Sequence, residues 1–346
     1  MNTICIGKRI IGEGHPCFII AEIGVNHNGD VNLAKKMIDA AILSGADAVK
    51  FQTWITEETI VKNVPKPLYQ KLATGYIESQ YDMVKKLELD EQDFKVLAEY
   101  ADRNGIEFLS TPEGITCTDW LDTIGVNAYK VSSPDLVNHP DLAYIAQKSK
   151  PVILSTGMAT LKEIRDAVNI IREQGNQNII LLHCTSSYPT NPEDANLNAI
   201  LTLKKKFKLP VGYSDHTVGT LAAGIAVALG ACVIEKHFTL DKTLQGPDHQ
   251  ASLEPDEFRA MVDTVRLTEK YLGSFTKKPV PAEHEMLHLS RKYLVAGCHI
   301  KKGEEIHRED IVIKKTGNGI HLPTFLNIKK IVGTRARKDY FIDDPI

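Results

Sequence analysis

Eight short apolar runs recur along the chain, and nearly every one ends in polar residues. The runs span residues 17–24 (CFIIAEIG), 48–53 (AVKFQT), 107–112 (EFLSTP), 128–133 (AYKVSS), 151–157 (PVILSTG), 179–186 (IILLHCTS), 211–216 (VGYSDH) and 232–238 (CVIEKHF). Runs of this length and composition are typical of buried parallel strands. The stretches between them have the spacing of amphipathic helices. Eight strands that alternate with helices predict a (β/α)8 TIM barrel.

The polar endings of these runs have a consequence for function. In a (β/α)8 barrel the carboxyl ends of all strands meet at one rim, where active sites lie. The rim is expected to gather two lysines, several hydroxyls, two histidines and carboxylates, with Asp215 among these at the end of the seventh run. Such a set suits a small anionic substrate together with a metal ion.

The composition narrows the class of protein. A formal net charge of -3 gives no reason to expect nucleic acid or an anionic membrane as a partner. No apolar stretch approaches the ~20 residues of a membrane span, and the first residues lack a secretory apolar core. We therefore expect a cytoplasmic protein. The six cysteines show no CxxC pair, which favours reduced thiols over a disulfide framework.

The chain is long enough for more than a barrel. We expect a catalytic barrel over residues 1–272, a linker over 273–286 and a small β-rich domain over 287–346. Residues 1–16 are expected to form a short lead-in, such as a hairpin closing the bottom of the barrel. Residues 55–89 form a long connection after the second strand, which favours a lid or a substrate loop.

Two histidines end neighbouring strands of the predicted barrel. His216 closes the seventh run and His237 the eighth, and adjacent strands lie ~4.8 Å apart. Both imidazoles can therefore reach one metal ion, and two protein ligands leave positions open, as in a catalytic site. The alternative is that each is a hydrogen-bonded core histidine.

Two lysines end the second and fourth runs. A lysine inside a barrel mouth is desolvated unless it meets an anion, so Lys50 and Lys130 favour phosphate or carboxylate binding. Thr111, Ser133 and Ser155 add hydroxyl donors. Glu22 sits in the first strand, where a buried carboxylate is unusual. It is either a general base, a substrate ligand or an ion-pair partner of Lys50.

The segments around these residues resemble the sialic acid synthase family, which includes N-acetylneuraminate synthase and its legionaminate and pseudaminate relatives. The resemblance covers almost the whole chain. Its motifs are AEIGVNHNGD (21–30), AVKFQT (48–53), FLSTP (108–112), YKVSS (129–133), LSTGMAT (154–160), LLHCTSSYPT (181–190), VGYSDHT (211–217), IEKHFTLDK (234–242) and GPDHQASLEPDEF (246–258). A GNG at residues 317–319 resembles the antifreeze-like (SAF-type) C-terminal domain of that family.

The resemblance implies a reaction. Members of the family condense phosphoenolpyruvate with an N-acylated amino sugar, release phosphate and form a nine-carbon 2-keto sugar acid. The first expected acceptor is N-acetylmannosamine, which gives N-acetylneuraminate. The alternative is 2,4-diacetamido-2,4,6-trideoxymannose, which gives N,N'-diacetyllegionaminate.

The resemblance also implies roles for residues. It implies a divalent ion, Mn²⁺ or Mg²⁺, held by His216 and His237. It places phosphoenolpyruvate against Lys50, Thr111, Lys130, Ser133, Ser155 and Ser214. It places Glu22, Gln52, Tyr188 and Asp248 near the sugar or the reacting centre. Glu22, Lys50 and Lys130 are expected to be catalytic, and the resemblance implies a homodimer whose tail domains each cover the partner's barrel mouth.

Four positions depart from the family pattern. Glu113 follows Pro112 where relatives often have phenylalanine, and Asp135 stands in place of a glutamate. Ser186 replaces an asparagine, and Lys315 replaces an arginine that contacts the sugar's N-acyl group. Asp135, Ser186 and Lys315 are still expected to bind substrate.

Two rival functions fit the sequence less well. A synthase that uses a phosphorylated sugar would favour an arginine cluster, and arginine is scarce near these strand ends. A non-catalytic binder of ice or carbohydrate would need neither the two histidines nor the two lysines.

Overall fold

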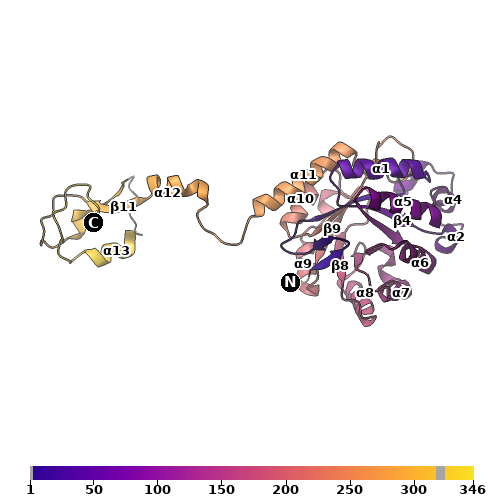
Figure 1. Ribbon diagram of the computed structural model, residues 1–346, viewed down its shortest axis with the longest axis horizontal. Coiled ribbons are helices and arrows are strands. Elements are labelled where there is room, and N and C mark those ends of the chain that lie inside the picture. The colour runs from indigo at the N-terminus through magenta and orange to yellow at the C-terminus, as the bar shows by residue number, and fades with distance from the viewer. Residues whose placement is uncertain (1–2, 317–323) are drawn as a thin grey trace. The chain divides into compact units, whose positions relative to one another are not determined.

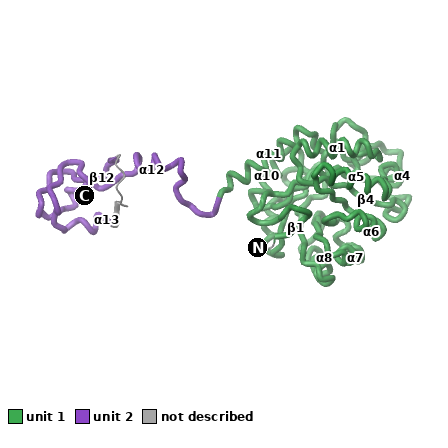
Figure 2. Tube along the Cα trace, viewed as in Figure 1, with its two compact units in different colours: residues 1–273 green, residues 274–346 purple. Residues whose placement is uncertain are grey.

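The structure is a computed structural model of the 346-residue chain, and it describes residues 3–316 and 324–346. The chain divides into two compact units, Met1–Gly273 and Ser274–Ile346 (Figure 2). Figure 1 shows the helices and strands of each unit. Among the described residues, no helix combines the length and the apolar character needed to cross a membrane. All six cysteines are free thiols.

The first unit contains an eight-stranded parallel sheet, which confirms the predicted barrel. Its strands are β3 (Phe18–Gly24), β4 (Ala48–Thr53), β5 (Glu107–Pro112), β6 (Tyr129–Val131), β7 (Val152–Ser155), β8 (Ile179–Cys184), β9 (Val211–Asp215) and β10 (Val233–His237). The hydrogen-bonded order is β5-β4-β3-β10-β9-β8-β7-β6, and β5 also lies against β6, so the sheet closes on itself. Each strand lies within one of the eight apolar runs.

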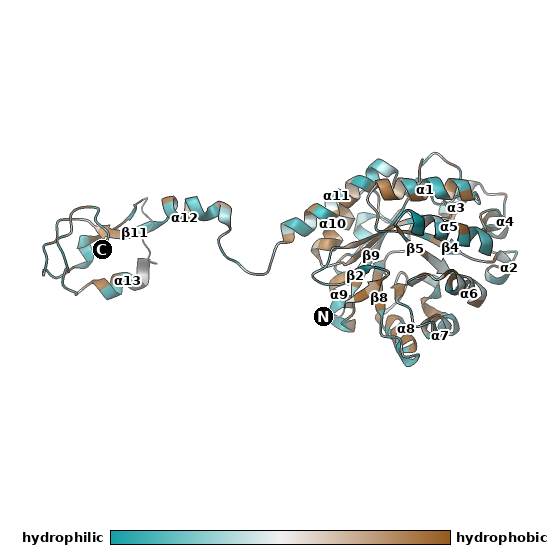
Figure 3. Cartoon of the chain, viewed as in Figure 1, coloured by the Kyte–Doolittle hydropathy of each residue, from teal (hydrophilic) through white to brown (hydrophobic). Residues whose placement is uncertain are grey.

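Helices follow the strands and cover the outside of the barrel. They are α1 (Val31–Leu43), α5 (Glu91–Arg103), α6 (Ile115–Ile124), α7 (His139–Gln147), α8 (Leu161–Glu173), α9 (Ala199–Phe207), α10 (Leu221–Ala228) and α11 (Pro255–Leu272). Their starts are encoded locally: Thr160 and Glu163 form a reciprocal capping box at α8, and Asp90 and Asp93 do so at α5. In Figure 3 the barrel strands are largely hydrophobic, whereas these helices mix both colours.

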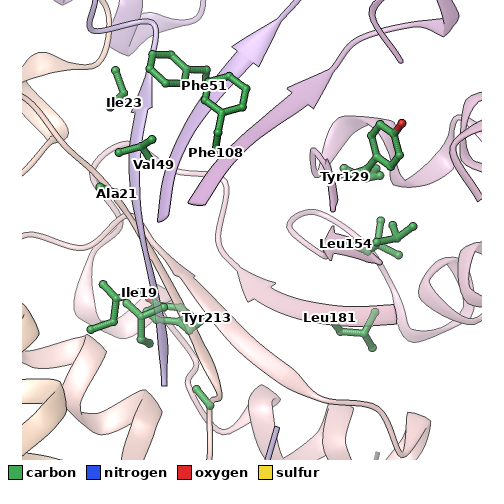
Figure 4. Packing of buried hydrophobic residues seen from close by; sticks show 14 of the residues in the cluster. Ile19, Ala21, Ile23, Val49, Phe51, Phe108, Tyr129, Leu154, Leu181 and Tyr213 are labelled. Atoms are coloured by element: carbon green, nitrogen blue, oxygen red, sulfur yellow. The ribbon is translucent and has the colours of Figure 1, made fainter. Parts of the chain in front are cut away.

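Two apolar layers hold the barrel together. Alternate strand residues such as Ile19, Val49 and Leu181 face the helices and form the larger core (Figure 4). The residues between them face the barrel interior, as the two-residue period of a strand requires. Near the amino ends of the strands the interior is apolar, with Ile20, Leu109 and their neighbours in one buried cluster.

A small hairpin fills the bottom of the barrel. Its strands are β1 (Ile4–Ile6) and β2 (Arg9–Ile11), which pair antiparallel. Ile4, Ile6 and Ile11 join the interior cluster, so the amino end of the barrel is sealed by apolar side chains. Polar interior residues are therefore confined to the other end. The expected lead-in hairpin is present.

The connection after β4 carries three short helices: α2 (Thr56–Thr59), α3 (Leu68–Thr74) and α4 (Gln80–Lys85). Val25, Trp54 and Leu87 form a small apolar cluster beneath them. The segment is thus anchored rather than structureless.

The second unit has its own core. It contains α12 (His284–Ser290), α13 (Thr324–Ile331) and an antiparallel pair, β11 (Lys292–Ala296) and β12 (Ile311–Lys315). Leu294, Ile300, Ile306 and Ile311 pack together inside it. The GNG at 317–319 lies outside the described residues, so the likeness of this unit to an antifreeze-like domain stays a prediction.

Candidate active site

A cavity of about 770 Å³ opens at the carboxyl ends of the barrel strands. Thirteen of the fifteen site residues expected from the sequence line it: Glu22, Lys50, Gln52, Thr111, Lys130, Ser133, Ser155, Ser186, Tyr188, Ser214, His216, His237 and Asp248. They come from all eight strands or the loops that follow them. The barrel topology therefore brings together residues spread over more than two hundred positions of sequence.

Lys50 lies on the floor of the cavity in a buried ion pair. Its Nζ is 2.6 Å from Oε2 of Glu22, and both side chains are at most 3% exposed. The same Nζ donates a hydrogen bond to Oγ1 of Thr111 at 3.1 Å. Burial opposes a charge on Lys50, but the carboxylates of Glu22 and Glu235 outweigh it and raise the pKa of Lys50. The ammonium group is therefore held in its charged form.

Glu22 is the carboxylate of that pair. Burial raises the pKa of Glu22, and Lys50 opposes this rise. Its Oε1 accepts a hydrogen bond from Nε2 of Gln52 at 2.9 Å. The carboxylate is thus held in place by two side chains that also line the cavity, which suits a group that orients or accepts a proton from a reacting hydroxyl.

Lys130 is the second cation of the floor. Its Nζ donates hydrogen bonds to Oγ of Ser155 at 2.7 Å and to the carbonyl oxygen of Val131 at 3.2 Å. Burial lowers the pKa of Lys130, the nearby Lys50 charge adds to this, and Glu235 opposes it. Lys130 has no carboxylate as close as the one beside Lys50, so an anionic ligand would relieve its burial.

Glu235 completes the floor, and it is not among the site residues expected from the sequence. Its two carboxylate oxygens lie 3.7 Å from Nζ of Lys130 and 3.9 Å from Nζ of Lys50. Oγ of Ser214 donates to Oε1 at 2.9 Å. Burial would raise the pKa of Glu235, but Lys130 and Lys50 lower it to about 2. The available signal was the strand period, because Glu235 precedes His237 by two residues and so faces the same interior.

The two histidines lie side by side at the mouth of β9 and β10. Their ring centroids are 5.6 Å apart. Nδ1 of His216 is 2.8 Å from the carbonyl oxygen of Thr185, so Nδ1 carries a proton and donates it to that oxygen. Burial opposes a charge on His216, but Cys184 and the Thr185 carbonyl outweigh burial and raise the pKa of His216. Burial, and then His216, lower the pKa of His237 well below its ordinary value. Its Nδ1 has no hydrogen-bond partner among the described residues, and Oδ2 of Asp248 is 3.8 Å away.

This arrangement fits a metal ion only in part. Within residues 3–316 and 324–346, no group of three or more His, Cys, Asp or Glu side chains is placed to hold one. Two neighbouring imidazoles, one with a buried ring nitrogen that lacks a hydrogen-bond partner among the described residues, nevertheless suit a divalent ion, which binds histidine in its neutral form. Such an ion would take its remaining ligands from water or substrate oxygens.

Aromatic rings form one wall of the cavity. Tyr188 packs against His216 with ring centroids 4.1 Å apart and stacks on Tyr69 at 5.1 Å. Tyr69 belongs to α3, in the long connection after β4, which therefore reaches the cavity. Tyr69 was not predicted, because nothing in the local sequence of the connection indicates which of its side chains turns inward.

Two expected ligands lie elsewhere. Asp135 is not among the residues that line the cavity, and its carboxylate accepts a hydrogen bond from Oγ of Ser132. Lys315 ends β12 in the second unit. Asp215, which the polar strand ends placed at the rim, instead faces outward and pairs with Lys236 at 2.9 Å. It occupies the odd register position between Ser214 and His216, so it points to the opposite face.

The chain is similar to known proteins over most of its length. The sequence model of the NeuB family matches residues 37–277. The N,N'-diacetyllegionaminic acid synthase of Legionella pneumophila is 46% identical over 333 residues, which cover 95% of this chain and 93% of that protein. The human N-acetylneuraminate-9-phosphate synthase is 39% identical over 313 residues, covering 90% and 86% respectively.

A solved structure has the same architecture. The N-acetylneuraminic acid (sialic acid) synthetase from Leptospira borgpetersenii, crystallised with citrate, superposes with a TM-score of 0.74 at 40% identity. The match covers 83% of this chain and 95% of that one.

Proposed function

Because this chain belongs to the NeuB family, we propose that it condenses phosphoenolpyruvate with 2,4-diacetamido-2,4,6-trideoxymannose. The products are phosphate and N,N'-diacetyllegionaminate, a nine-carbon 2-keto sugar acid. The observation that carries the proposal is the convergence of Lys50, Lys130 and hydroxyl donors on one buried floor beside two neighbouring histidines.

The floor matches phosphoenolpyruvate in charge. That substrate carries a carboxylate and a phosphate on three carbons, so it needs two cations and several donors close together. Lys50 and Lys130 supply the cations, and Thr111, Ser155 and Ser214 supply hydroxyl groups. Lysine is a common phosphate ligand because its three donors rotate to suit the anion.

His216 and His237 would hold the divalent ion, Mn²⁺ or Mg²⁺. When bound, such an ion supplies Lewis acidity toward the aldehyde oxygen of the open-chain sugar. Burial lowers the pKa of His237, which keeps its imidazole neutral, and the Thr185 carbonyl orients the ring of His216. The pKa of His216 is raised, so binding of an ion at its Nε2 would release a proton.

The bonds exchanged in the reaction balance without a further reactant besides water. Carbon 3 of phosphoenolpyruvate forms a bond to the aldehyde carbon, and the aldehyde oxygen takes a proton. Water adds to the electron-poor carbon 2, and the C–O bond to phosphate breaks. Glu22, ion-paired with Lys50 and hydrogen-bonded by Gln52, would orient the reacting hydroxyl or water and hold its proton.

The choice of acceptor rests on two points. The diacetyllegionaminate synthase of Legionella pneumophila is more similar to this chain than the human 9-phosphate synthase is. No arginine lies among the described residues that line the cavity, which disfavours a phosphorylated sugar. N-acetylmannosamine is the second candidate, supported by the 40% identity to the sialic acid synthetase of Leptospira borgpetersenii.

Phosphate release from phosphoenolpyruvate tests the proposal. The assay contains Mn²⁺ and either the diacetamido sugar or N-acetylmannosamine, with His237→Ala as the control. We expect release with the diacetamido sugar, at a higher kcat/KM than with N-acetylmannosamine, and loss of release in the variant. Release with N-acetylmannosamine alone would show that the product is N-acetylneuraminate and not N,N'-diacetyllegionaminate. Release with neither sugar would refute the reaction.

The assembly is a separate part of the proposal. We expect a homodimer in solution, as the family resemblance implies, with Lys315 as a ligand of the sugar. Light scattering of the full chain after gel filtration measures the mass directly. A mass of one chain, 38.4 kDa, would contradict this part of the proposal without affecting the chemistry.

A further inference from the structure

Glu113 lines the cavity directly after the end of β5. It follows Pro112, the last residue of β5, and its backbone N–H donates to the carbonyl oxygen of Thr53 at 2.9 Å. The parallel pairing of β4 and β5 thus continues through Glu113. Two residues separate it from Thr111, so both side chains face the interior, with Glu113 roughly 7 Å nearer the mouth. Both residues line the cavity.

The Glu113 carboxylate has no protein donor. Among the described residues it makes neither a side-chain hydrogen bond nor an ion pair. Burial, and then the like charge of Asp135, raise the pKa of Glu113 to about 7. A carboxylate that faces a cavity under these conditions gains from a ligand that brings a hydrogen-bond donor.

This carboxylate cannot serve the anionic substrate. On the proposed function, phosphoenolpyruvate meets the lysines of the floor, one level deeper, where the carboxylates of Glu22 and Glu235 are paired with those cations. Glu113 has no cation beside it among the described residues, so its carboxylate would repel the anion. On the same function, the space that remains toward the mouth would hold the acceptor sugar. Glu113 therefore faces a neutral group that donates a hydrogen bond.

The neighbours of Glu113 indicate which group. Pro134 follows β6 and Met158 follows β7, so with Glu113 they close three successive strands, and all three residues line the cavity. Pro134 has no backbone N–H and Met158 is apolar. An acceptor oxygen beside apolar surface suits an acylamino group, whose N–H meets the carboxylate while its methyl group meets the apolar atoms. A hydroxyl would use only the first of these contacts.

We propose that Glu113, Pro134 and Met158 form a subsite for the second acylamino substituent of the acceptor sugar. This inference rests on the proposed function and adds the residue that separates the two candidate acceptors. It concerns binding only, with no covalent step.

Steady-state kinetics with both sugars test the subsite. We expect Glu113→Leu to lower the ratio of kcat/KM for the diacetamido sugar to kcat/KM for N-acetylmannosamine by about tenfold or more. Glu113→Gln keeps an acceptor oxygen and should lower the ratio less. Met158→Asn should also lower it, through loss of apolar contact. Glu107→Gln, at the opposite end of β5 and bonded to Asn127, is the matched control and should leave the ratio unchanged.

The outcomes separate this inference from the proposed function. Equal losses with both sugars in Glu113→Leu and Glu113→Gln would overturn the subsite, as would a raised KM for phosphoenolpyruvate with an unchanged ratio. If wild-type enzyme fails to condense the diacetamido sugar, the proposed acceptor is wrong instead. Circular dichroism and thermal unfolding report whether each variant folds. If Glu113→Leu does not fold, the ratios measured for Glu113→Gln and Met158→Asn still test the subsite.

Discussion

The ammonium nitrogen of Lys50 lies 2.6 Å from a carboxylate oxygen of Glu22, and both groups are buried below the rim of the barrel. The two residues are direct partners in the register of β3 and β4. The pair fixes the Lys50 cation on the floor of the cavity, and the Glu22 carboxylate balances the charge of that cation. Lys130 lacks such a close partner, because its nearest carboxylate oxygen, on Glu235, lies 3.7 Å away, so Lys130 is the less compensated cation of the two.

Breaking the Lys50–Glu22 pair should destabilise the barrel. Removing one partner leaves a buried charge, which costs ~3 kcal/mol or more. We expect Glu22→Gln and Lys50→Met each to lower the free energy of unfolding by about that amount in urea titrations. The double variant should lose less than the sum of the two. Additive losses would show that the two side chains do not interact in the folded protein.

Lys130→Met should act mainly on phosphoenolpyruvate. The substitution removes the cation that the floor leaves least compensated, so we expect kcat/KM for phosphoenolpyruvate to fall by ~100-fold or more, the loss of a charge-assisted contact. The substitution also takes from Glu235 its nearest cation, 3.7 Å away, so urea unfolding of the variant is measured beside its kinetics. A similar effect on the sugar KM alone would contradict this assignment. Lys148→Met, on the outer surface and paired with Asp119, is a control.

Tyr69 should hold the ring of Tyr188 in the cavity wall and so favour binding of the acceptor sugar. Its ring stacks on Tyr188, which in turn packs on His216. Tyr69→Ala should raise the KM for the acceptor sugar about tenfold through loss of an aromatic contact, while the KM for phosphoenolpyruvate changes little. Tyr69→Phe keeps the ring and should behave like wild type. If Tyr69→Phe loses as much as Tyr69→Ala, the hydroxyl group rather than the stack is responsible.

Glu113 should make stability depend on pH. Its pKa is raised to about 7 in the folded protein, mainly by burial, above the ordinary glutamate value of ~4.3 in the unfolded chain. The folded state therefore binds the Glu113 proton more tightly than the unfolded chain does. This binding adds to the free energy of unfolding at low pH, and the contribution is lost as the pH rises from about 4.5 through 7. Glu113→Gln cannot ionise. Relative to wild type, it should be more stable at pH 8 than at pH 5.

Urea unfolding at the two pH values measures this difference. The variant's free energy of unfolding minus that of wild type should increase between pH 5 and pH 8. A difference that stays constant would show that Glu113 ionises equally in both states.

Much of the fold and site follows from local patterns. The eight apolar runs predict strands because a strand buried on both faces is largely apolar, and each of the eight runs contains one barrel strand. The closure of the barrel then brings Glu22, Lys50, Lys130 and the two histidines together, since parallel strands share one carboxyl end.

The errors have a common physical origin. Asp215 ends a strand at the rim, but its register turns it outward toward Lys236, whereas the register of Glu235, which does not end its strand, turns it inward toward Ser214. Counting polar strand ends without following the two-residue period explains both. Tyr69 is different, because its contact with Tyr188 depends on how a long connection folds back, which no local pattern encodes.

The most direct test of the proposed chemistry is condensation in water enriched in ¹⁸O, with mass spectrometry of both products. The sample contains the full chain, Mn²⁺, phosphoenolpyruvate and the diacetamido sugar, and the keto acid is trapped by reduction before its oxygen exchanges. Cleavage of the C–O bond predicts ¹⁸O at carbon 2 of the nine-carbon acid and none in the phosphate. Label in the phosphate, or phosphate released without the acceptor sugar, would contradict the account.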